Sequence, residues 1–555
     1  MGHYLFMPKL DMSMEEGMIV QWLIKEGDQI EKGDYVVEVE TGKVSIQVDN
    51  TIAAGTVLRL YAQTGDTVKV NVPIMYIGKK GESVPLPEEY VAQSADNVPM
   101  TQNDEAERQV HKQDYDMVVI GGGPGGYTCA IRAAQLGKRV LIVEREMLGG
   151  ICLNRGCIPT KSFIRNAEVL QTVRNAMQMG ISADGIRFDW SEVIRRKNEV
   201  VASLQRGIRV MMKQNGIDVV YGEGELSGRH SVRVGEKTYT AGKVVIATGT
   251  KQSAFEDVSG TDFRIYNCDE ILEIEQLPKD MLIVGAGIIG IEMAYVFNQY
   301  GVNVTIVEQN GRILSDADHE ISAILAKELK NSGINLILDC KIQGSEGNQI
   351  HFDNGSSVPA DTIFYTTNRQ ALVPASYEPL RTFSGYLAVD EELKTSLPGV
   401  YAIGDCNGKM STAHAAIRQG NVLAENFFGN GGKINYDMIP SCIYSNPETA
   451  WIGMTEEEAR ARKIPIKVSK TRFASVGKAI ASAQTQGLVK VIADSRWDEI
   501  LGVHIIGANA TDIIAQAAIT MTAELSADDI ANTVFAHPTF SEAFMEACGG
   551  LQHSS

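Results

Sequence analysis

One glycine pattern occurs twice in this chain of 555 residues and limits how it can fold. The first copy, Gly-Gly-Gly-Pro-Gly-Gly at 121–126, and the second, Gly-Ala-Gly-Ile-Ile-Gly at 285–290, each follow an apolar run. In both copies the sequence predicts a strand, a glycine-rich turn, a helix and a second strand that ends in glutamate. Four positions correspond at a constant offset of 164 residues: Gly121 and Gly285, Gly126 and Gly290, Gly137 and Gly301, and Glu144 and Glu308.

This pattern is the fingerprint of a dinucleotide-binding βαβ unit. The first glycine allows a tight turn, the second lets the backbone approach a pyrophosphate at the helix N-terminus, and the third lets helix and strand pack closely. One such pattern is weak evidence, but two copies with the same spacing predict two Rossmann-like dinucleotide-binding domains in an α/β chain. The predicted contacts are Gly121, Gly123, Gly126 and Glu144 in the first unit, and Gly285, Gly287, Gly290 and Glu308 in the second.

The acidic residue of the second unit predicts which nicotinamide cofactor it takes. Glu308 can accept hydrogen bonds from a ribose 2′-hydroxyl and would repel a 2′-phosphate, which favours NAD over NADP. Arg312 lies close enough in sequence to offset this preference, but we interpret it as a surface residue.

A pair of cysteines follows the first unit directly. Cys152 and Cys157 come just after Gly149-Gly150, where a helix can begin. Their spacing of little more than one helical turn allows a disulfide, and a helix N-terminus favours the thiolate. Two unrelated buried cysteines would be the simpler interpretation of an isolated pair. Next to a nucleotide-binding unit, however, the pair predicts a redox-active disulfide that lies against a bound redox cofactor.

The first 78 residues contain a second, smaller repeat. The stretch from Gly17 to Gly27-Asp28 is echoed by Gly55 to Gly65-Asp66, and short β-rich runs between these turns predict a small β-sandwich. Lys43 lies at a turn between the two halves, where a solvated lysine is the ordinary interpretation. Residues 79–114 lose the apolar pattern and predict a flexible linker.

Residues 1–78 resemble the lipoyl domains of 2-oxo acid dehydrogenase complexes. The matching stretches are Met7-Pro8-Lys9-Leu10, Glu26-Gly27-Asp28 and Glu40-Thr41-Gly42-Lys43. The resemblance implies that Lys43 carries lipoate in amide linkage. The family usually has aspartate before this lysine, and Gly42 stands in its place.

From about residue 115 to residue 547 the chain resembles the flavoprotein disulfide reductases, and within them the dihydrolipoamide dehydrogenases. The motifs that carry the resemblance are the run from Gly149 to Lys161, Ala247-Thr248-Gly249, Tyr401-Ala402-Ile403-Gly404-Asp405 and Ala536-His537-Pro538-Thr539-Phe540-Ser541-Glu542. The resemblance implies a homodimer that uses FAD and NAD. Its expected activity is the oxidation of protein-bound dihydrolipoyl groups, with hydride passed to NAD.

The combined prediction is a small all-β lipoyl sandwich followed by two Rossmann-like domains and an α+β interface domain. The expected ranges are 1–78 for the lipoyl domain, 79–114 for the linker, 115–262 for the FAD-binding domain, 263–385 for the NAD-binding domain, 386–435 for a central segment completing the FAD site and 436–555 for the dimer-interface domain.

The resemblance also implies a role for each residue of the expected active site. Cys152 is the sulfur attacked by the substrate, and Cys157 faces the flavin. His537 is the acid/base supplied to the partner subunit's disulfide, and Glu542 orients it. A base is required because a dithiol attacks a disulfide only as thiolate.

Further positions follow from the same resemblance. The expected FAD contacts outside the fingerprint are Thr248, Gly249, Asp405 and Lys161. Glu292 is expected beside the nicotinamide as the partner of Lys161, although an ordinary ion pair would explain both residues equally, and His414 is interpreted as structural.

Two departures from the family's pattern concern other positions. Phe535 stands where the family has a second histidine, and Thr367-Asn368-Arg369 replaces an Ile-Gly-Arg strand end.

Charge and apolar patterning exclude several classes of partner. The net charge of −18 would repel nucleic acid and anionic lipid. The longest apolar run, 281–297, contains glycines and Glu292, so it predicts a buried strand and helix in place of a membrane span. Eight cysteines, mostly far apart, and the absence of a signal segment predict a cytoplasmic location. We expect no metal site.

Other functions within and outside this family fit the sequence less well. A mercuric reductase would need a cysteine pair near the C-terminus, where only Cys548 is found, and a glutathione reductase would not be expected to carry a lipoyl domain and would prefer NADP. A different class of function is a lipoyl carrier or docking module with auxiliary reductase activity. The expected partners are the acyltransferase core and lipoyl domains of a complex acting on pyruvate, 2-oxoglutarate, branched-chain 2-oxo acids or acetoin.

Overall fold

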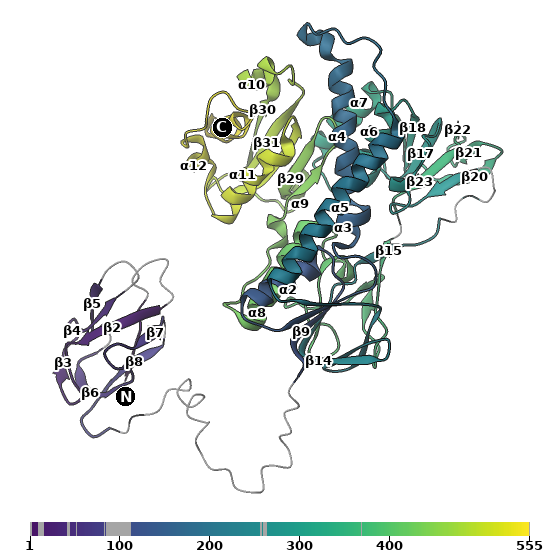
Figure 1. The fold of residues 1–555 in the computed structure, drawn as a ribbon. Helices are drawn as coiled ribbons and strands as arrows, with labels where there is room; N and C mark the ends of the chain where they lie inside the picture. Colours follow the sequence, from purple (N-terminus) through teal and green to yellow (C-terminus); the bar gives the residue numbers. More distant parts are fainter. Residues whose placement is uncertain are drawn as a thin grey trace. The chain divides into compact units, whose positions relative to one another are not determined.

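The computed structural model divides the chain into two compact units, Met1–His111 and Lys112–Ser555. The residues it describes are 3–8, 16–40, 45–51, 53–70, 72–82, 84, 113–255, 258, 263–367 and 369–553. Lys43, Gly42 and most of the predicted linker lie outside these residues. Each unit is drawn in Figure 1.

The N-terminal unit is a sandwich of two four-stranded sheets, as the internal repeat predicts. The sheet orders are β1-β8-β6-β3 and β5-β4-β2-β7. The strands are β1 (His3–Phe6), β2 (Glu16–Trp22), β3 (Gln29–Ile30), β4 (Tyr35–Glu40), β5 (Ser45–Asp49), β6 (Gly55–Leu60), β7 (Thr67–Lys69) and β8 (Pro73–Gly78).

The two repeats of this sandwich bond to each other reciprocally. The Gly27 amide donates to the Val57 carbonyl at 2.7 Å, and the Gly65 amide donates to the Ile19 carbonyl at 2.8 Å. Both glycines have positive φ, +98° and +95°, which a residue with a side chain rarely adopts. Ile19 and Val57 are fully buried in the sandwich core, so the repeated turns fix how the two sheets face each other.

The first nucleotide unit has the predicted strand, turn, helix and strand. β9 (Tyr115–Ile120) leads into α2 (Pro124–Gln135) and then β10 (Val140–Glu144). The parallel strands run in the order β11-β10-β9-β14, and β27, from much later in the chain, pairs with β14. The remaining elements of this region are β11 (Asp218–Tyr221), β12 (Gly224–Gly228), β13 (Ser231–Val234), β14 (Lys237–Ile246), β27 (Val400–Ala402) and α8 (Ala413–Phe428), which packs against α2.

The second nucleotide unit repeats this arrangement in a parallel sheet of order β16-β23-β17-β18-β19. Its elements are β16 (Arg264–Tyr266), β17 (Asp280–Val284), α6 (Ile288–Gln299), β18 (Asn303–Glu308), α7 (His319–Asn331), β19 (Asn335–Leu338), β20 (Ile342–Glu346), β21 (Gln349–Phe352), β22 (Ser357–Pro359) and β23 (Thr362–Tyr365). Two small strand pairs complete the region: β15 (Thr250–Gln252) with β24 (Arg369–Ala371), and β25 (Thr382–Phe383) with β26 (Tyr386–Leu387).

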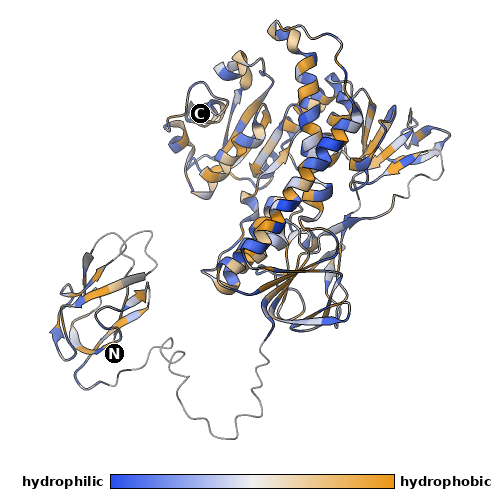
Figure 2. Cartoon of the chain, in the orientation of Figure 1, coloured by the Kyte–Doolittle hydropathy of each residue, from blue (hydrophilic) through white to orange (hydrophobic). Residues whose placement is uncertain are grey.

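Three α-helices lie between β10 and β11 in the sequence. They are α3 (Gly150–Arg155), α4 (Cys157–Arg174) and α5 (Trp190–Gln214), and α4 contacts both α5 and α6. Polar and apolar residues alternate along the two long helices, α4 and α5 (Figure 2), as expected for helices that bury one face. Among the described residues, no helix combines the length and apolar character needed to cross a bilayer.

The C-terminal part is a five-stranded antiparallel sheet of order β28-β29-β32-β31-β30 with helices packed against it. The strands are β28 (Ser441–Ile443), β29 (Thr449–Gly453), β30 (Ile466–Arg472), β31 (Gly487–Asp494) and β32 (Ile500–Gly507). The helices are α9 (Glu456–Ala461), α10 (Gly477–Ala481), α11 (Ala510–Thr522), α12 (Ala527–Ala531) and α13 (Glu542–Gly550). This is the α+β architecture predicted for the interface domain.

Candidate functional site

The glycines of the first fingerprint make the close approaches that their positions require. A Cβ on Gly121, whose φ is +107°, would lie 2.3 Å from the Ala247 carbonyl oxygen, and a Cβ on Gly126 would lie 2.0 Å from the Gly121 oxygen. Gly123 precedes α2 without a side-chain cap, and the nearest atom to its missing Cβ is 3.8 Å away. The amides at the start of α2 are therefore free of covering side chains, which fits a pyrophosphate.

The carboxylates at the two strand ends make the same bond at the same offset. Glu144 accepts from the Gly122 amide at 2.7 Å, and Glu308 accepts from the Ala286 amide at 2.9 Å. Glu308 also accepts from the backbone and side chain of Asn310, at 3.0 and 2.8 Å. Each carboxylate is thus held beside its glycine turn, where it can meet a ribose. Asn310 was not predicted from the sequence, since its role depends on the turn that follows the strand.

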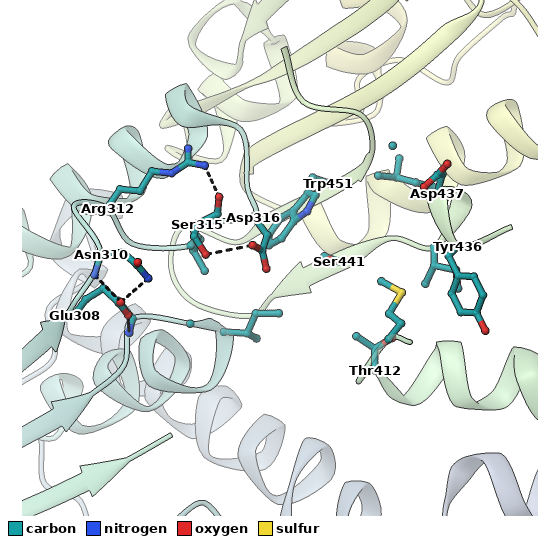
Figure 3. A pocket seen from close by; sticks show the side chains of 18 residues that line it. Glu308, Asn310, Arg312, Ser315, Asp316, Thr412, Tyr436, Asp437, Ser441 and Trp451 are labelled. Atoms are coloured by element: carbon teal, nitrogen blue, oxygen red, sulfur yellow. Dashed lines mark hydrogen bonds between the residues drawn. The ribbon is translucent and has the colours of Figure 1, made fainter. Parts of the chain in front are cut away.

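A cavity of about 480 Å³ opens at the second fingerprint (Figure 3). Gly287 borders it, and nothing lies within 4 Å of where a Cβ on Gly287 would be. Glu308, Asn310 and Arg312 form one wall, and Arg312 donates to the Ser315 carbonyl. Arg312, interpreted from sequence as a surface residue, is therefore part of this cavity.

The opposite side of the cavity comes from distant parts of the chain. It includes Thr412 before α8, Tyr436 and Asp437 from a short 3-10 helix, and Ser441 and Trp451 from β28 and β29. The size of the space and the Glu308 carboxylate in its wall fit a dinucleotide. Sequence patterns contain no signal for these wall residues, because they are remote from the fingerprint.

The two predicted redox cysteines lie at adjacent helix starts. Cys152 is in the first turn of α3, Gly156 separates the helices, and Cys157 is the first residue of α4. Both are partly buried free thiols in this structure. The hydrogen bond between the two sulfurs lowers the pKa of Cys157 and raises the pKa of Cys152, and the positive charge of Lys161 also lowers the pKa of Cys157. Of the two thiols, Cys157 therefore loses its proton more readily.

Lys161 and Glu292 form the ion pair that the sequence allowed as an alternative to cofactor contacts. Lys161 Nζ lies 2.9 and 2.8 Å from the two Glu292 oxygens, and the Tyr444 amide donates to the same carboxylate at 3.0 Å. Lys161 also lies 4.4 Å from the centre of the Tyr444 ring. Glu292 is only 2% exposed, so α4, α6 and the segment after β28 meet at one buried charge.

His537 and Glu542 form the predicted pair at the start of α13. The His537 Nδ1 lies 2.8 Å from Glu542 Oε1, and the Thr539 amide donates to Glu542 Oε2 at 2.8 Å. The Thr539 amide and His537 hold the pKa of Glu542 below its usual value. The His537 side chain is 77% exposed.

No hydrogen bond joins His537 to Cys152 or Cys157 among the described residues of the chain. In Figure 1 the helix α12, which precedes His537, lies well apart from α3. One chain therefore presents the histidine and the cysteines at separate places.

The remaining expected FAD contacts surround the ends of β14 and β27. The Thr248 hydroxyl donates to the Leu372 carbonyl, and Gly249 has a φ of +70°. Burial raises the pKa of the Asp405 carboxyl, and the charge of Arg369 partly offsets this.

Gln419, which was not predicted from the sequence, holds the turn that carries Asp405. Its Oε1 accepts from the Gly404 amide at 2.7 Å and from Asn407 Nδ2 at 2.9 Å. Gln419 is fully buried on α8, in a part of the chain without a recognisable motif.

The other singled-out positions have structural surroundings. His414 Nε2 lies 2.7 Å from the Pro440 carbonyl oxygen, in agreement with a structural role. Phe535, in place of a second histidine, packs against the apolar core of the C-terminal sheet. Arg369 donates to the Thr250 hydroxyl at 3.0 Å, while Asn368 lies outside the described residues. Within the described ranges, His, Cys, Asp and Glu side chains form no group of three that could hold a metal ion.

Sequence profiles of known families match nearly the whole chain. The profile described as pyridine nucleotide-disulphide oxidoreductase matches residues 115–420, and its dimerisation domain matches 439–548. The profile described as biotin-requiring enzyme, the biotin/lipoyl domain, matches residues 3–77.

Curated relatives and solved structures cover the larger unit. The dihydrolipoyl dehydrogenase of Bacillus subtilis (strain 168) is 37% identical over 460 residues, covering 78% of this chain and 97% of the relative. The dihydrolipoyl dehydrogenase of Rhizobium etli is 36% identical, with 78% and 97% covered. The HOCl-induced flavoprotein disulfide reductase RclA from Escherichia coli superimposes with a TM-score of 0.70 at 27% identity, covering 78% of this chain and 99% of RclA.

Proposed function

This chain belongs to the pyridine nucleotide-disulphide oxidoreductase family, and we propose that it is a dihydrolipoyl dehydrogenase that reoxidises protein-bound dihydrolipoyl groups and reduces NAD to NADH. The observation that carries the proposal is the hydrogen-bonded pair of Cys152 and Cys157, which follows the first nucleotide unit directly. When these two cysteines form a disulfide, the pair can accept two electrons from a dithiol substrate. Bound FAD supplies the hydride chemistry between the cysteine pair and NAD.

The lowered pKa of Cys157 explains why the two sulfurs have different roles. In the oxidised pair, a substrate thiolate attacks the sulfur of Cys152, and the disulfide bond breaks with Cys157 leaving as thiolate. A leaving sulfur with a lower pKa departs faster. The second substrate thiolate then displaces Cys152, so the dithiol becomes a disulfide and the cysteine pair becomes reduced. Lys161 stabilises the negative charge left on Cys157.

His537 supplies the base for this exchange. Glu542 holds Nδ1, so the Nε2 nitrogen is available to take a proton from the substrate thiol. Because His537 is exposed and remote from the cysteines of its own chain, we propose that it completes the site of a second copy. The match to a dimerisation domain supports a homodimer.

The N-terminal domain provides a lipoyl group on the same polypeptide. We propose that Lys43 carries it, and that the enzyme works with the acyltransferase core and lipoyl domains of a 2-oxo acid or acetoin dehydrogenase complex. The profile match over residues 3–77 supports this assignment. Intact mass of natively expressed protein should show one lipoyl group, which is lost in Lys43→Ala.

The central test is Cys152→Ser. We expect NAD reduction by dihydrolipoamide to fall by about a thousandfold or more, because the attacked sulfur is missing. Cys129→Ser, at a buried cysteine of α2, is the matched control and should retain activity and flavin absorbance. A normal rate in Cys152→Ser would end the proposed mechanism.

The carrier alternative has a separate test. In a reconstituted complex, Lys43→Arg should slow turnover while the oxidation of free dihydrolipoamide is unchanged, if the arm serves as an auxiliary carrier. Loss of both activities would indicate that the front domain is needed for the reductase itself.

A further inference from the structure

A buried charge cluster lies where the second nucleotide unit meets the C-terminal sheet. Lys490, on β31, is 1% exposed, and its Nζ lies 2.9 and 2.8 Å from the two oxygens of Asp318, which is fully buried. The same Nζ lies 2.8 Å from Glu456 and 3.5 Å from Glu320. Burying a lysine and a carboxylate costs several kcal/mol per ion before pairing, so this contact needs a reason beyond stability.

Asp318, the acidic partner of Lys490, lies just after the loop that forms one wall of the NAD cavity. Arg312, Leu314, Ser315 and Asp316 line that cavity, and Asp318 follows two residues later as the N-cap of α7. Asp318 Oδ1 accepts from the Glu320 amide at 3.0 Å, which joins the bound carboxylate to the helix start. The loop that borders the cavity is therefore anchored at its C-terminal end by Lys490.

The basic partner is tied to the opposite wall through the sheet. Trp451, which lines the cavity, is the cross-strand neighbour of His504, and His504 is the cross-strand neighbour of Lys490. Directly opposed residues of antiparallel strands share one face of the sheet. Trp451, His504 and Lys490 thus form a row, and the same rigid sheet carries both the cavity wall and the cation.

The middle member of this row is a buried neutral histidine. His504 Nε2 lies 3.0 Å from the Met454 carbonyl oxygen, and its Nδ1 has no hydrogen-bond partner among the residues that the structure describes. Burial lowers the pKa of His504, while Asp318 acts in the opposite direction. Burial also acts to lower the pKa of Lys490, but Asp318 and Glu456 raise it above its ordinary value. The row therefore presents one permanent positive charge to Asp318.

We propose that Lys490 is a positioning residue that sets the width of the NAD cavity by fastening the 312–318 loop to the C-terminal sheet. The inference rests on the proposed NAD-dependent function. It adds a residue that contacts neither the cysteines nor the residues expected to bind the cofactors. The reaction needs the nicotinamide held at a fixed place. The ion pair of Lys490 and Asp318, called the latch below, fixes the two cavity walls relative to each other.

The test compares two lysines of one cluster in the full-length, FAD-loaded protein. Lys490→Met removes the charge with little change in length. Lys470→Met is the matched control, because Lys470 is the cross-strand neighbour of Lys490 and pairs with Glu320 at 2.6 Å, but its side chain is 41% exposed. Binding of NAD to the oxidised protein is measured by titration calorimetry, and kcat and KM for NAD are measured with dihydrolipoamide.

Lys490→Met should weaken NAD binding and raise the KM for NAD about tenfold, with kcat at saturating NAD within about twofold of wild type. The flavin spectrum should be unchanged, and Lys470→Met should bind NAD within about twofold of wild type. Wild-type NAD affinity in a folded Lys490→Met protein would overturn the proposal.

Lys490→Met leaves Asp318 as an unpaired buried carboxylate, which alone can unfold a protein. The double variant Lys490→Met/Asp318→Asn removes both charges and keeps the inference testable. Weakened NAD binding with full FAD content supports the latch, whereas wild-type affinity in the double variant would contradict it. If the wild type fails to oxidise dihydrolipoamide but Lys490→Met still weakens NAD binding, the proposed function fails while the latch stands.

Discussion

The two nucleotide units form the same local bonds but have different surroundings. Glu144 and Glu308 both accept from the amide in the second position of their glycine turns. After the first unit the chain enters α3 and the cysteine pair, whereas after the second it enters the loop that borders the 480 Å³ cavity. The repeated sequence thus forms the same glycine turn with the same bound carboxylate twice. The segment that follows each turn decides which chemistry takes place beside it.

The largest expected effects come from the third glycine of each unit. A Cβ on Gly126 would lie 2.0 Å from the Gly121 oxygen, and a Cβ on Gly290 would lie 2.1 Å from the Gly285 oxygen. Alanine at either position should cost about 1–3 kcal/mol through overpacking. We expect Gly126→Ala to lose FAD, and Gly290→Ala to keep FAD but lose NAD binding, measured by flavin absorbance and calorimetry.

Gly207→Ala on the surface of α5 is the control for both variants, because no atom lies within 4 Å of its missing Cβ. It should retain both cofactors. If Gly126→Ala and Gly290→Ala lost the same cofactor, the assignment of one nucleotide to each unit would be wrong.

Smaller effects should separate Glu308 from Asn310, the residue that donates two hydrogen bonds to it. Glu308→Ala should raise the KM for NAD about tenfold and reduce discrimination against NADP, since one charged hydrogen-bond acceptor is removed. Asn310→Ala should raise the KM only about two- to threefold, because the Ala286 amide still holds Glu308. Steady-state kinetics with NAD and NADP check both, and a larger effect from Asn310→Ala would contradict the order.

The smallest effect concerns the cysteine that follows the first unit. Because the pKa of Cys157 is lowered, this thiol loses its proton at lower pH than an ordinary cysteine. Cys268 in the second unit has a pKa raised to about 11 by burial and stays protonated. Ultraviolet titration of the reduced protein should show one thiolate below pH 9 that is missing in Cys157→Ser and retained in Cys268→Ser. If the wild type, Cys157→Ser and Cys268→Ser gave the same titration curve, the thiolate would belong to another cysteine.

Local stereochemistry explains why much of the fold could be predicted from the sequence. Gly27 and Gly65 adopt positive φ, and Gly126 and Gly290 allow close backbone packing, wherever such a turn occurs. These backbone conformations and close approaches depend on neighbours within a few residues. The repeats with offsets of 38 and 164 residues therefore predicted the sandwich and the two βαβ units. The pairing of His537 with Glu542 was likewise predictable, because both residues lie within one short motif.

Only the tertiary structure decided the contacts between distant segments. Gln419 supports the Asp405 turn, Trp451 closes the cavity, and Lys490 holds Asp318 across 172 residues of sequence. A buried lysine or glutamine has no local pattern that distinguishes it from a surface residue, since its partner is chosen by how sheets and helices pack. The sequence by itself therefore determined the two glycine turns and the reactive side chains. The packing of distant segments determined how the walls of the sites around them are held in place.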